Sequence, residues 1–147
     1  MKILLATDGS AHSKKMITEF AGRTFAPNTK VRIISAYDSS LYMMNTDPIM
    51  GPLSEYHAIV DDYSQRSAKK AVEDAAALVH KKRPKLSIST AAIEGSPKSV
   101  ILEAAKKFGA NLIVVGSHGH GAVSGFLLGS VSQAVSLHAT CSVEIVR

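Results

Sequence analysis

The chain has 147 residues, a length that fits one domain with a hydrophobic core of its own. Its single cysteine, Cys141, excludes an internal disulfide, and the sequence has no CxxC motif or Cys/His cluster typical of zinc sites. Seventeen Lys and Arg against twelve Asp and Glu give a formal net charge of +5. The first apolar run is too short for a signal segment, and no segment approaches the ~18 apolar residues of a membrane span, so we expect a cytoplasmic protein.

The first third of the chain predicts two strands around one helix. Residues 3–7 form a compact apolar run that indicates a strand. The turn at 8–10 follows, and Ser10 is placed to cap a helix that begins near Ala11. Residues 31–37 predict the second strand. The buried face of the helix between them is indicated by apolar residues at helical spacing, namely Met16, Ile17, Phe20 and Ala21.

The middle of the chain predicts a surface excursion, a long helix and an edge strand. Residues 39–53 contain two prolines and a glycine and are expected to run over the surface. Residues 56–82 show helical periodicity, and residues 86–93 alternate apolar and polar positions as a half-exposed edge strand does. Ser96 and Pro97 predict the next helix start, with the Ser96 hydroxyl as its cap, and Gly109 predicts its left-handed end.

The last third predicts a central strand at 112–115, a helix at 129–138 and a final strand at 143–146. Strands that alternate with helices indicate a parallel sheet covered by helices on both faces. We therefore predict a single doubly wound α/β domain over residues 1–147.

The basic residues are concentrated where helices are expected to end. Residues 80–85 carry the densest run, and Lys106 and Lys107 precede Gly109. Cations complement the negative end of a helix dipole, and no aromatic residues are interleaved with them as stacking partners for bases. We therefore predict solvated helix ends here rather than a nucleic-acid surface.

A glycine-spaced loop follows the predicted central strand. Gly116 and Gly119 lie in it, and Gly129 with Ser130 opens the last helix. Glycines let backbone amides approach a bound group closely, and a helix N-terminus adds unpaired N–H donors and positive dipole charge. The pattern predicts a phosphate-binding loop, the alternative being a flexible loop with turn glycines.

A second turn is a candidate for the same site. In open parallel sheets, ligands bind beyond the carboxyl ends of the strands, where strand order reverses. Asp8 follows the first strand and Gly116 ends the fourth, so the two face each other only if these strands are neighbours. Spacing alone does not decide that adjacency.

Four segments of the chain resemble the universal stress protein family. They are ATDGS at 6–10, EGSP at 94–97, GANLIVVGSHG at 109–119 and LLGSVSQAV at 127–135, and the resemblance covers essentially the whole chain. The family's ATP-binding branch carries glycine, two residues, glycine, nine residues, glycine, then serine or threonine, which this chain matches from Gly116 to Ser130. The resemblance implies a five-stranded sheet of order 3-2-1-4-5 in a three-layer α/β/α fold like that of the adenine nucleotide alpha hydrolases.

The resemblance also implies the site residues. Thr7 and Asp8 would lie near the adenosine, with Ala36 contacting the base through its backbone. The remaining contacts would come from the glycine loop and the helix after it. The ribose and phosphates would be lined by Gly116, His118 and Gly119. The phosphate oxygens would be bound by Gly129, Ser130, Val131 and Ser132. The alternatives are that Asp8 caps the first helix, that Ser130 caps the last, and that His118 is an exposed loop residue, as we expect His120 to be.

The resemblance implies a regulatory protein of the stress response that binds ATP, ADP or AMP and acts on an unknown protein partner. Mg²⁺ or Mn²⁺ could bridge the phosphates of the nucleotide. No GxxxxGK[ST] motif is present, so fast hydrolysis is not expected. Slow ATP hydrolysis with water positioned by His118 or Asp8 is the alternative. A flavin or dinucleotide site is disfavoured because its glycine-rich turn belongs after the first strand.

The C-terminus departs from the family pattern, which resembles HAPCPVLVVR where this chain has HATCSVEIVR. Two prolines are lost and Glu144 is gained. The family often pairs its last strand with that of a second subunit, so we expect a homodimer. Glu144 would either block that edge or meet a basic residue across the interface.

Overall fold

A five-stranded parallel sheet forms the centre of the protein. The structure, a computed structural model, describes residues 1–38, 53–119 and 128–147, and of residues 53–59 only the course of the backbone. Its strands lie in the order β3-β2-β1-β4-β5, which confirms the predicted fold class. Their bounds are β1 Lys2–Ala6, β2 Lys30–Tyr37, β3 Ser87–Glu94, β4 Leu112–Gly116 and β5 Ser142–Val146.

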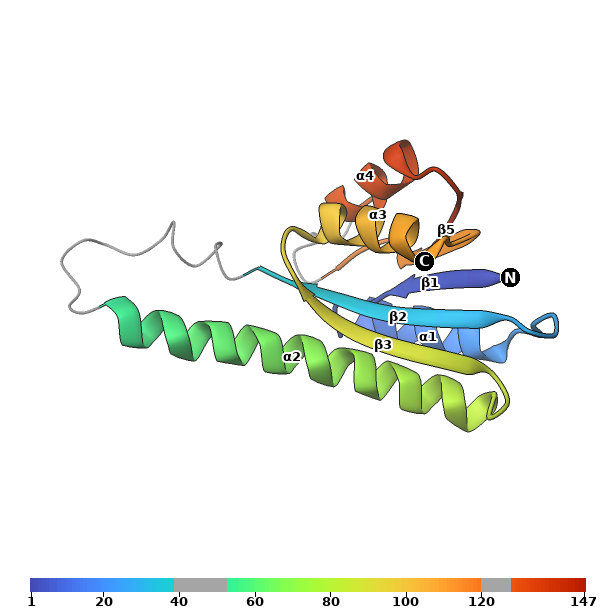
Figure 1. Ribbon diagram of the computed structural model, residues 1–147, viewed down its shortest axis with the longest axis horizontal. Helices are drawn as coiled ribbons and strands as arrows, with labels where there is room; N and C mark the ends of the chain where they lie inside the picture. The colour runs from blue at the N-terminus through green and yellow to red at the C-terminus, as the bar shows by residue number, and fades with distance from the viewer. Residues whose placement is uncertain (39–52, 120–127) are drawn as a thin grey trace.

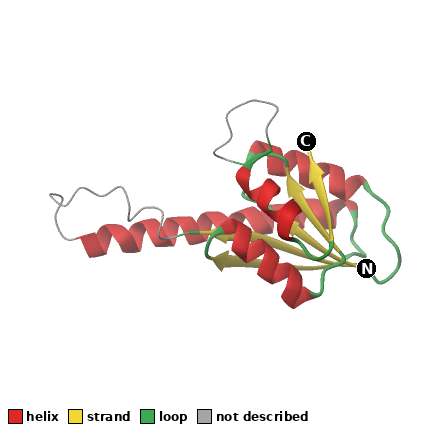
Figure 2. Ribbon diagram, turned by 90° about the horizontal axis from the view of Figure 1, so that it is seen from above, coloured by secondary structure: helices red, strands yellow, loops and turns green. Residues whose placement is uncertain are grey.

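Helices cover both faces of this sheet (Figures 1 and 2). Helices α1 (Ala11–Gly22) and α2 (Leu53–Lys82) lie on one face, and α3 (Pro97–Phe108) and α4 (Ser130–His138) lie on the other. Neighbouring residues of β1 point to opposite faces of the sheet. Leu5 packs in the core on the face covered by α1 and α2, and Leu4 packs in the core on the face covered by α3 and α4. Both side chains are fully buried, as expected for a central strand between two helical layers.

The register of β1 decides where the loops meet. Ile3 pairs with Leu112 of β4 on one side and with Val31 of β2 on the other. Because all three strands are parallel, the residues after β1, β2 and β4 reach the same edge of the sheet. The predicted site residues on these loops are therefore brought to one place by the central strand.

The helix boundaries mostly follow the sequence signals. Ser10 is the N-cap of α1, and its hydroxyl accepts the backbone N–H of Ser13 at 3.2 Å, as predicted. Gly109 ends α3 with a left-handed backbone, φ 66°, also as predicted. The expected cap of α3 is wrong in one respect, because Ser96 stands at the N-cap position but its hydroxyl makes no capping bond. Pro97 in the first turn needs no hydrogen bond for its nitrogen, so this end requires less capping.

The first part of α2 extends past the sheet (Figures 1 and 2). The helix has 30 residues and begins at Leu53, three residues before the predicted start. Its buried positions recur from Ala68 through Val72 and Ala75 to Val79, where the helix lies over the strands. The predicted excursion at 39–53 lies almost entirely outside the described residues. None of the described helices is long and apolar enough to cross a membrane.

Glu144 of β5 is paired within the chain. Arg23, which follows α1, donates from Nη1 to Glu144 Oε2 at 2.6 Å and from Nη2 to Glu144 Oε1, and its Nη2 also lies 3.1 Å from Glu19 Oε1. The hydrogen bond to Glu144 raises the pKa of the Arg23 guanidinium, against the opposing effect of burial. Neither expectation for Glu144 included this partner. The carboxylate ties the edge strand to α1 across 121 positions of sequence.

Candidate functional site

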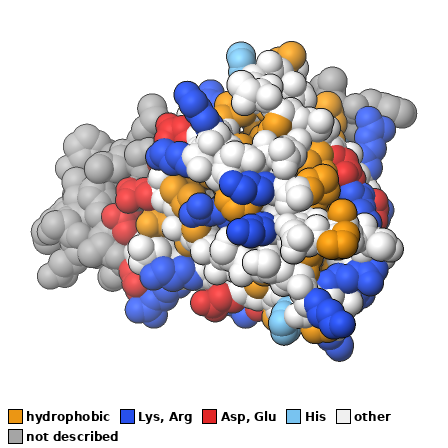
Figure 3. Space-filling view, turned by 45° about the vertical axis from the view of Figure 1, so that its right-hand side comes forward, with side chains coloured by type: hydrophobic (Ala, Val, Ile, Leu, Met, Phe, Trp, Pro, Cys, Tyr) orange, Lys and Arg blue, Asp and Glu red, His pale blue; other side chains and the backbone are white. Residues whose placement is uncertain are grey.

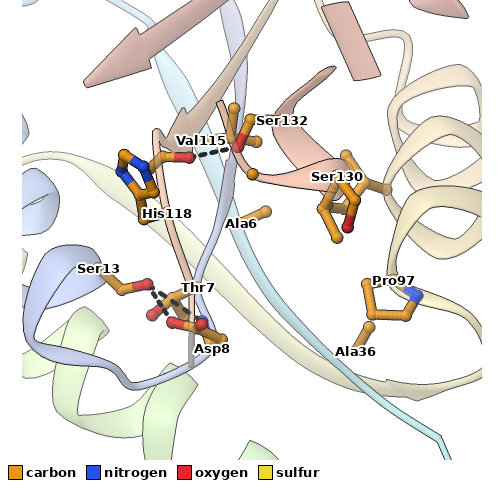
Figure 4. A pocket seen from close by; sticks show the side chains of 15 residues that line it. Ala6, Thr7, Asp8, Ser13, Ala36, Pro97, Val115, His118, Ser130 and Ser132 are labelled. Atoms are coloured by element: carbon orange, nitrogen blue, oxygen red, sulfur yellow. Dashed lines mark hydrogen bonds between the residues drawn. The ribbon is translucent and has the colours of Figure 1, made fainter. Parts of the chain in front are cut away.

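A cavity of about 280 Å³ opens at the carboxyl edge of the sheet. Figure 4 shows its lining, which comes from the ends of β1, β2 and β4 and from the starts of α1, α3 and α4. The structure brings all the sequence-predicted site residues together in this lining, namely Thr7, Asp8, Ala36, Gly116, His118, Gly119, Gly129, Ser130, Val131 and Ser132. Five further residues line it, namely Ala6, Ser13, Pro97, Ile101 and Val115.

Asp8 is held in place by the turn that starts α1. Its Oδ1 accepts the backbone N–H of Ser10 at 3.0 Å. The same oxygen accepts the hydroxyl of Ser13 (Figure 4). The backbone N–H of Asp8 in turn donates to Ser13 Oγ at 3.3 Å. The N-cap is Ser10, so the alternative in which Asp8 caps the helix is wrong. Asp8 supports the turn through one carboxylate oxygen, and the other oxygen faces the glycine loop.

The close approach of that loop explains Gly119. A Cβ added at Gly119 would lie 2.5 Å from Asp8 Oδ2, closer than any carbon and oxygen pack. Gly129 is less severely restricted, because its Cβ would lie 3.1 Å from the Ser117 carbonyl oxygen, which accepts the Gly129 N–H at 2.8 Å. The close approach to Asp8 therefore requires glycine at position 119, whereas a side chain at position 129 would need the Ser117 carbonyl to move by a few tenths of an ångström.

The N-terminus of α4 forms one wall of the cavity. Gly129 is the N-cap and Ser130, Val131 and Ser132 are the first helical residues, whose N–H groups have no partner inside the helix. Ser130 is not the cap, and its hydroxyl makes no hydrogen bond with any described residue. Ser132 donates its hydroxyl to the Gly116 carbonyl at 2.5 Å, which fastens the helix start to the end of β4 (Figure 4).

His118 is a half-buried residue of the cavity wall rather than an exposed loop residue. Its Nδ1 lies 3.0 Å from the Ser117 hydroxyl, and its ring centroid lies 5.7 Å from that of His12. Its Nε2 is buried and has no hydrogen-bond partner in the described part of the chain. Buried polar atoms are normally paired, so this nitrogen is a candidate ligand contact. His120 lies outside the described residues.

The part of the cavity around Ala36 and Pro97 is apolar. Figure 4 shows Ala36 and Pro97 next to each other there, and Ile101 of α3 also lines the cavity. Together they offer a surface for a flat apolar group, while the α4 N-terminus offers donors for an anion. Sequence reasoning missed Pro97 as a site residue, although it ends the quoted EGSP motif, and it missed Ser13, whose role depends on a contact with Asp8.

The described residues contain no group of three His, Cys, Asp or Glu side chains that could hold a metal ion.

The model of the universal stress protein family matches residues 1–147. The chain belongs to the universal stress protein family. A universal stress protein relative from Staphylococcus aureus (strain USA300) is 30% identical over 150 residues, which cover 99% of this chain and 82% of the relative.

Solved universal stress proteins share the whole fold. The protein UspA from Lactobacillus plantarum has a TM-score of 0.81 at 23% identity and covers 100% of this chain and 97% of its own. An Arabidopsis thaliana family member with AMP bound has a TM-score of 0.69 at 16% identity, over 99% and 90% of the two chains. A member from Archaeoglobus fulgidus in complex with dAMP has a TM-score of 0.64 at 19% identity, and the match covers 100% of this chain and 98% of that chain.

Proposed function

We propose that this universal stress protein binds an adenine nucleotide in the cavity at the carboxyl edge of its sheet. It would act in the cytoplasm as a regulatory protein of the stress response, through the state of its bound nucleotide rather than through turnover. One observation carries the proposal: loops far apart in sequence place an apolar surface, a fixed carboxylate and a helix N-terminus around one cavity.

The residues fit the three parts of such a ligand. The surface of Ala36, Pro97 and Ile101 suits the adenine ring, and the carboxylate of Asp8 is placed to accept from ribose hydroxyls. The α4 N-terminus and the Gly119 backbone suit phosphate oxygens, which accept N–H bonds and favour the positive end of the dipole. Mg²⁺ or Mn²⁺ would then bind through the phosphates and water rather than through a cluster of protein ligands.

Relatives support this choice of ligand. The Arabidopsis structure holds AMP and the Archaeoglobus structure holds dAMP, in proteins of the same fold. The engagement of Asp8 Oδ1 by Ser10 and Ser13 favours a binding role for this carboxylate over a role in activating water.

Calorimetric titration with ATP, ADP and AMP tests the proposal directly. We expect saturable heat at one site per chain for at least one of the three nucleotides, together with a rise in the melting temperature. Absence of both effects at millimolar nucleotide would contradict it. Release of phosphate from ATP by protein purified to homogeneity would instead support the hydrolytic alternative, provided that substitution of Asp8 or His118 lowers it.

The Asp8→Ala variant should bind nucleotide about 1 to 3 kcal/mol more weakly, because a half-buried hydrogen-bond acceptor for the ligand is lost. Ser13→Ala is the matched control, since it removes a contact of Asp8 Oδ1 but leaves the carboxylate that faces the loop. We expect a smaller loss for Ser13→Ala. Titration of both variants measures the difference, and an unchanged affinity of Asp8→Ala would reduce Asp8 to a support of the turn.

We further propose that the chain forms a homodimer through β5, which is an end strand of the sheet. The charge that could block this edge, Glu144, is neutralised by Arg23. Sedimentation equilibrium at micromolar concentration should give twice the chain mass of 15.6 kDa. A single-chain mass would refute this assembly.

A further inference from the structure

A second cavity, of about 540 Å³, lies at the opposite edge of the sheet. One wall is residues 24–30, from the connection between α1 and β2 to the first residue of β2. The other wall is residues 82–87, from the last residue of α2 to the first residue of β3. Strand β2 links the two cavities, because Lys30 at its start lines this one and Ala36 near its end lines the first. Six residues of extended strand separate them by about 20 Å.

The lining of this cavity is strongly basic. Four of its side chains are cationic, namely Lys30, Lys82, Arg83 and Lys85, and no Asp or Glu is among the lining residues. Within the described residues, none of the four forms an ion pair, since the ion pairs there involve Arg23, Arg66, Lys70 and Lys107. Figure 3 shows Lys and Arg side chains spread over a face that includes this end of the molecule. No carboxylate among the lining residues balances the mutual repulsion of these four cations.

Arg83 adds a preorganised hydrogen-bond donor. Its Nη2 donates to the Gly22 carbonyl oxygen at 2.7 Å, which fixes the guanidinium between the end of α1 and the end of α2. Its Nε is buried and has no acceptor in the described part of the chain. A buried donor without an acceptor costs free energy, and a bound oxyanion would supply the missing acceptor.

The dipole of α2 does not explain the whole cluster. Lys82 lies in the last turn of α2, where a cation complements the negative end of the helix. Lys30, however, begins a strand, and Lys85 lies in the connection between α2 and β3. The dipole of α2 therefore accounts for Lys82 but not for these two lysines, which line the same cavity.

We propose that this cavity is an anion site for a compact ligand with two or more phosphoryl groups. Four cations from two separate segments of the chain match a multivalent anion better than a single phosphate, and the planar guanidinium of Arg83 suits phosphoryl oxygens. The site is separate from the nucleotide cavity and does not depend on the function proposed for it.

Titration of the full chain with sodium tripolyphosphate, at constant ionic strength, tests this site. We expect the wild type to bind, and to bind orthophosphate at least tenfold more weakly. Lys85→Glu and Arg83→Gln should each weaken tripolyphosphate binding at least tenfold. Lys81→Glu is the matched control, because it makes the same change of charge at a neighbouring residue outside the lining, and it should change the affinity less than threefold.

Three outcomes would overturn the proposal: no binding by the wild type, equal weakening by Lys81→Glu and Lys85→Glu, or loss of binding in Gly119→Val. The second outcome would mean attraction by net charge alone, and the third would place the anion in the nucleotide cavity. Lys85 is exposed, so Lys85→Glu decides the question even if Arg83→Gln fails to fold, as circular dichroism would reveal.

Discussion

The Gly119→Val variant should lose adenine-nucleotide binding while its domain stays folded. The Cβ alone would lie 2.5 Å from Asp8 Oδ2, and this carboxylate has little room to move because Ser10 and Ser13 hold its other oxygen. The loop after β4 must therefore shift away from Asp8. That shift separates the carboxylate from the backbone N–H groups of the glycine loop, so the two halves of the site no longer fit one ligand.

A graded series makes this result specific. Gly119→Ala adds only the Cβ and should already weaken binding at least tenfold, or about 1.4 kcal/mol. Gly22→Ala is the matched control, because its Cβ at the end of α1 would have no atom within 4 Å apart from its chain neighbours and the nearby backbone of the helix itself. Its nucleotide affinity should equal that of the wild type. Calorimetry measures the affinities, and circular dichroism checks that each variant is folded. Wild-type affinity in Gly119→Val would show that the loop does not bind the nucleotide.

The Phe20→Ala variant should lower the free energy of unfolding by about 3 to 5 kcal/mol. Phe20 is fully buried in the cluster between the sheet and the helices α1 and α2, and its ring lies 4.9 Å from that of Phe25. Removing the ring deletes apolar contacts and leaves a cavity that the rigid sheet cannot close. A typical domain has only about 5 to 15 kcal/mol of stability, so the variant should be close to unfolding.

Urea unfolding followed by circular dichroism measures this loss. Lys15→Ala, an exposed position on the same helix, is the control and should change the free energy of unfolding by less than about 0.5 kcal/mol. A loss below about 1.5 kcal/mol in Phe20→Ala would contradict the packing described for this cluster. At temperatures where the variant remains folded, its nucleotide affinity should stay near that of the wild type, because Phe20 lies a full two turns beyond Ser13.

Much of the fold could be predicted because the signals for its elements are local. Apolar runs, alternation and helical spacing indicated the strands and helices of the described residues. Ser10 and Gly109 marked helix ends correctly because capping depends on a few neighbouring residues. The Ser96 cap was wrong because a residue type allows a capping bond but does not fix the rotamer that makes it. The start of α2 lay three residues earlier than predicted, since helical periodicity is weakest where a helix leaves the sheet.

The candidate site could be predicted in its residues but not in its contacts. The glycine spacing and the resemblance indicated ten of the fifteen residues that line the cavity, and their roles toward a nucleotide stay predictions. The position of Ser13 against Asp8 was not predictable, because many serines follow a helix cap without holding a carboxylate. The same holds for the unpaired Nε2 of His118, whose burial depends on the packing of the loop beside α1.

By itself, the sequence determined which segments are strands and helices and that a glycine-spaced loop leads into the last helix, because these properties depend on residues close together in the chain. The tertiary structure decided which loops meet. β1 pairs with β4 across more than a hundred residues, and only that pairing puts Asp8 against Gly119. The tertiary structure also decided that Glu144 pairs with Arg23. The packing of α1 against the sheet, rather than any local pattern, brings those two side chains together.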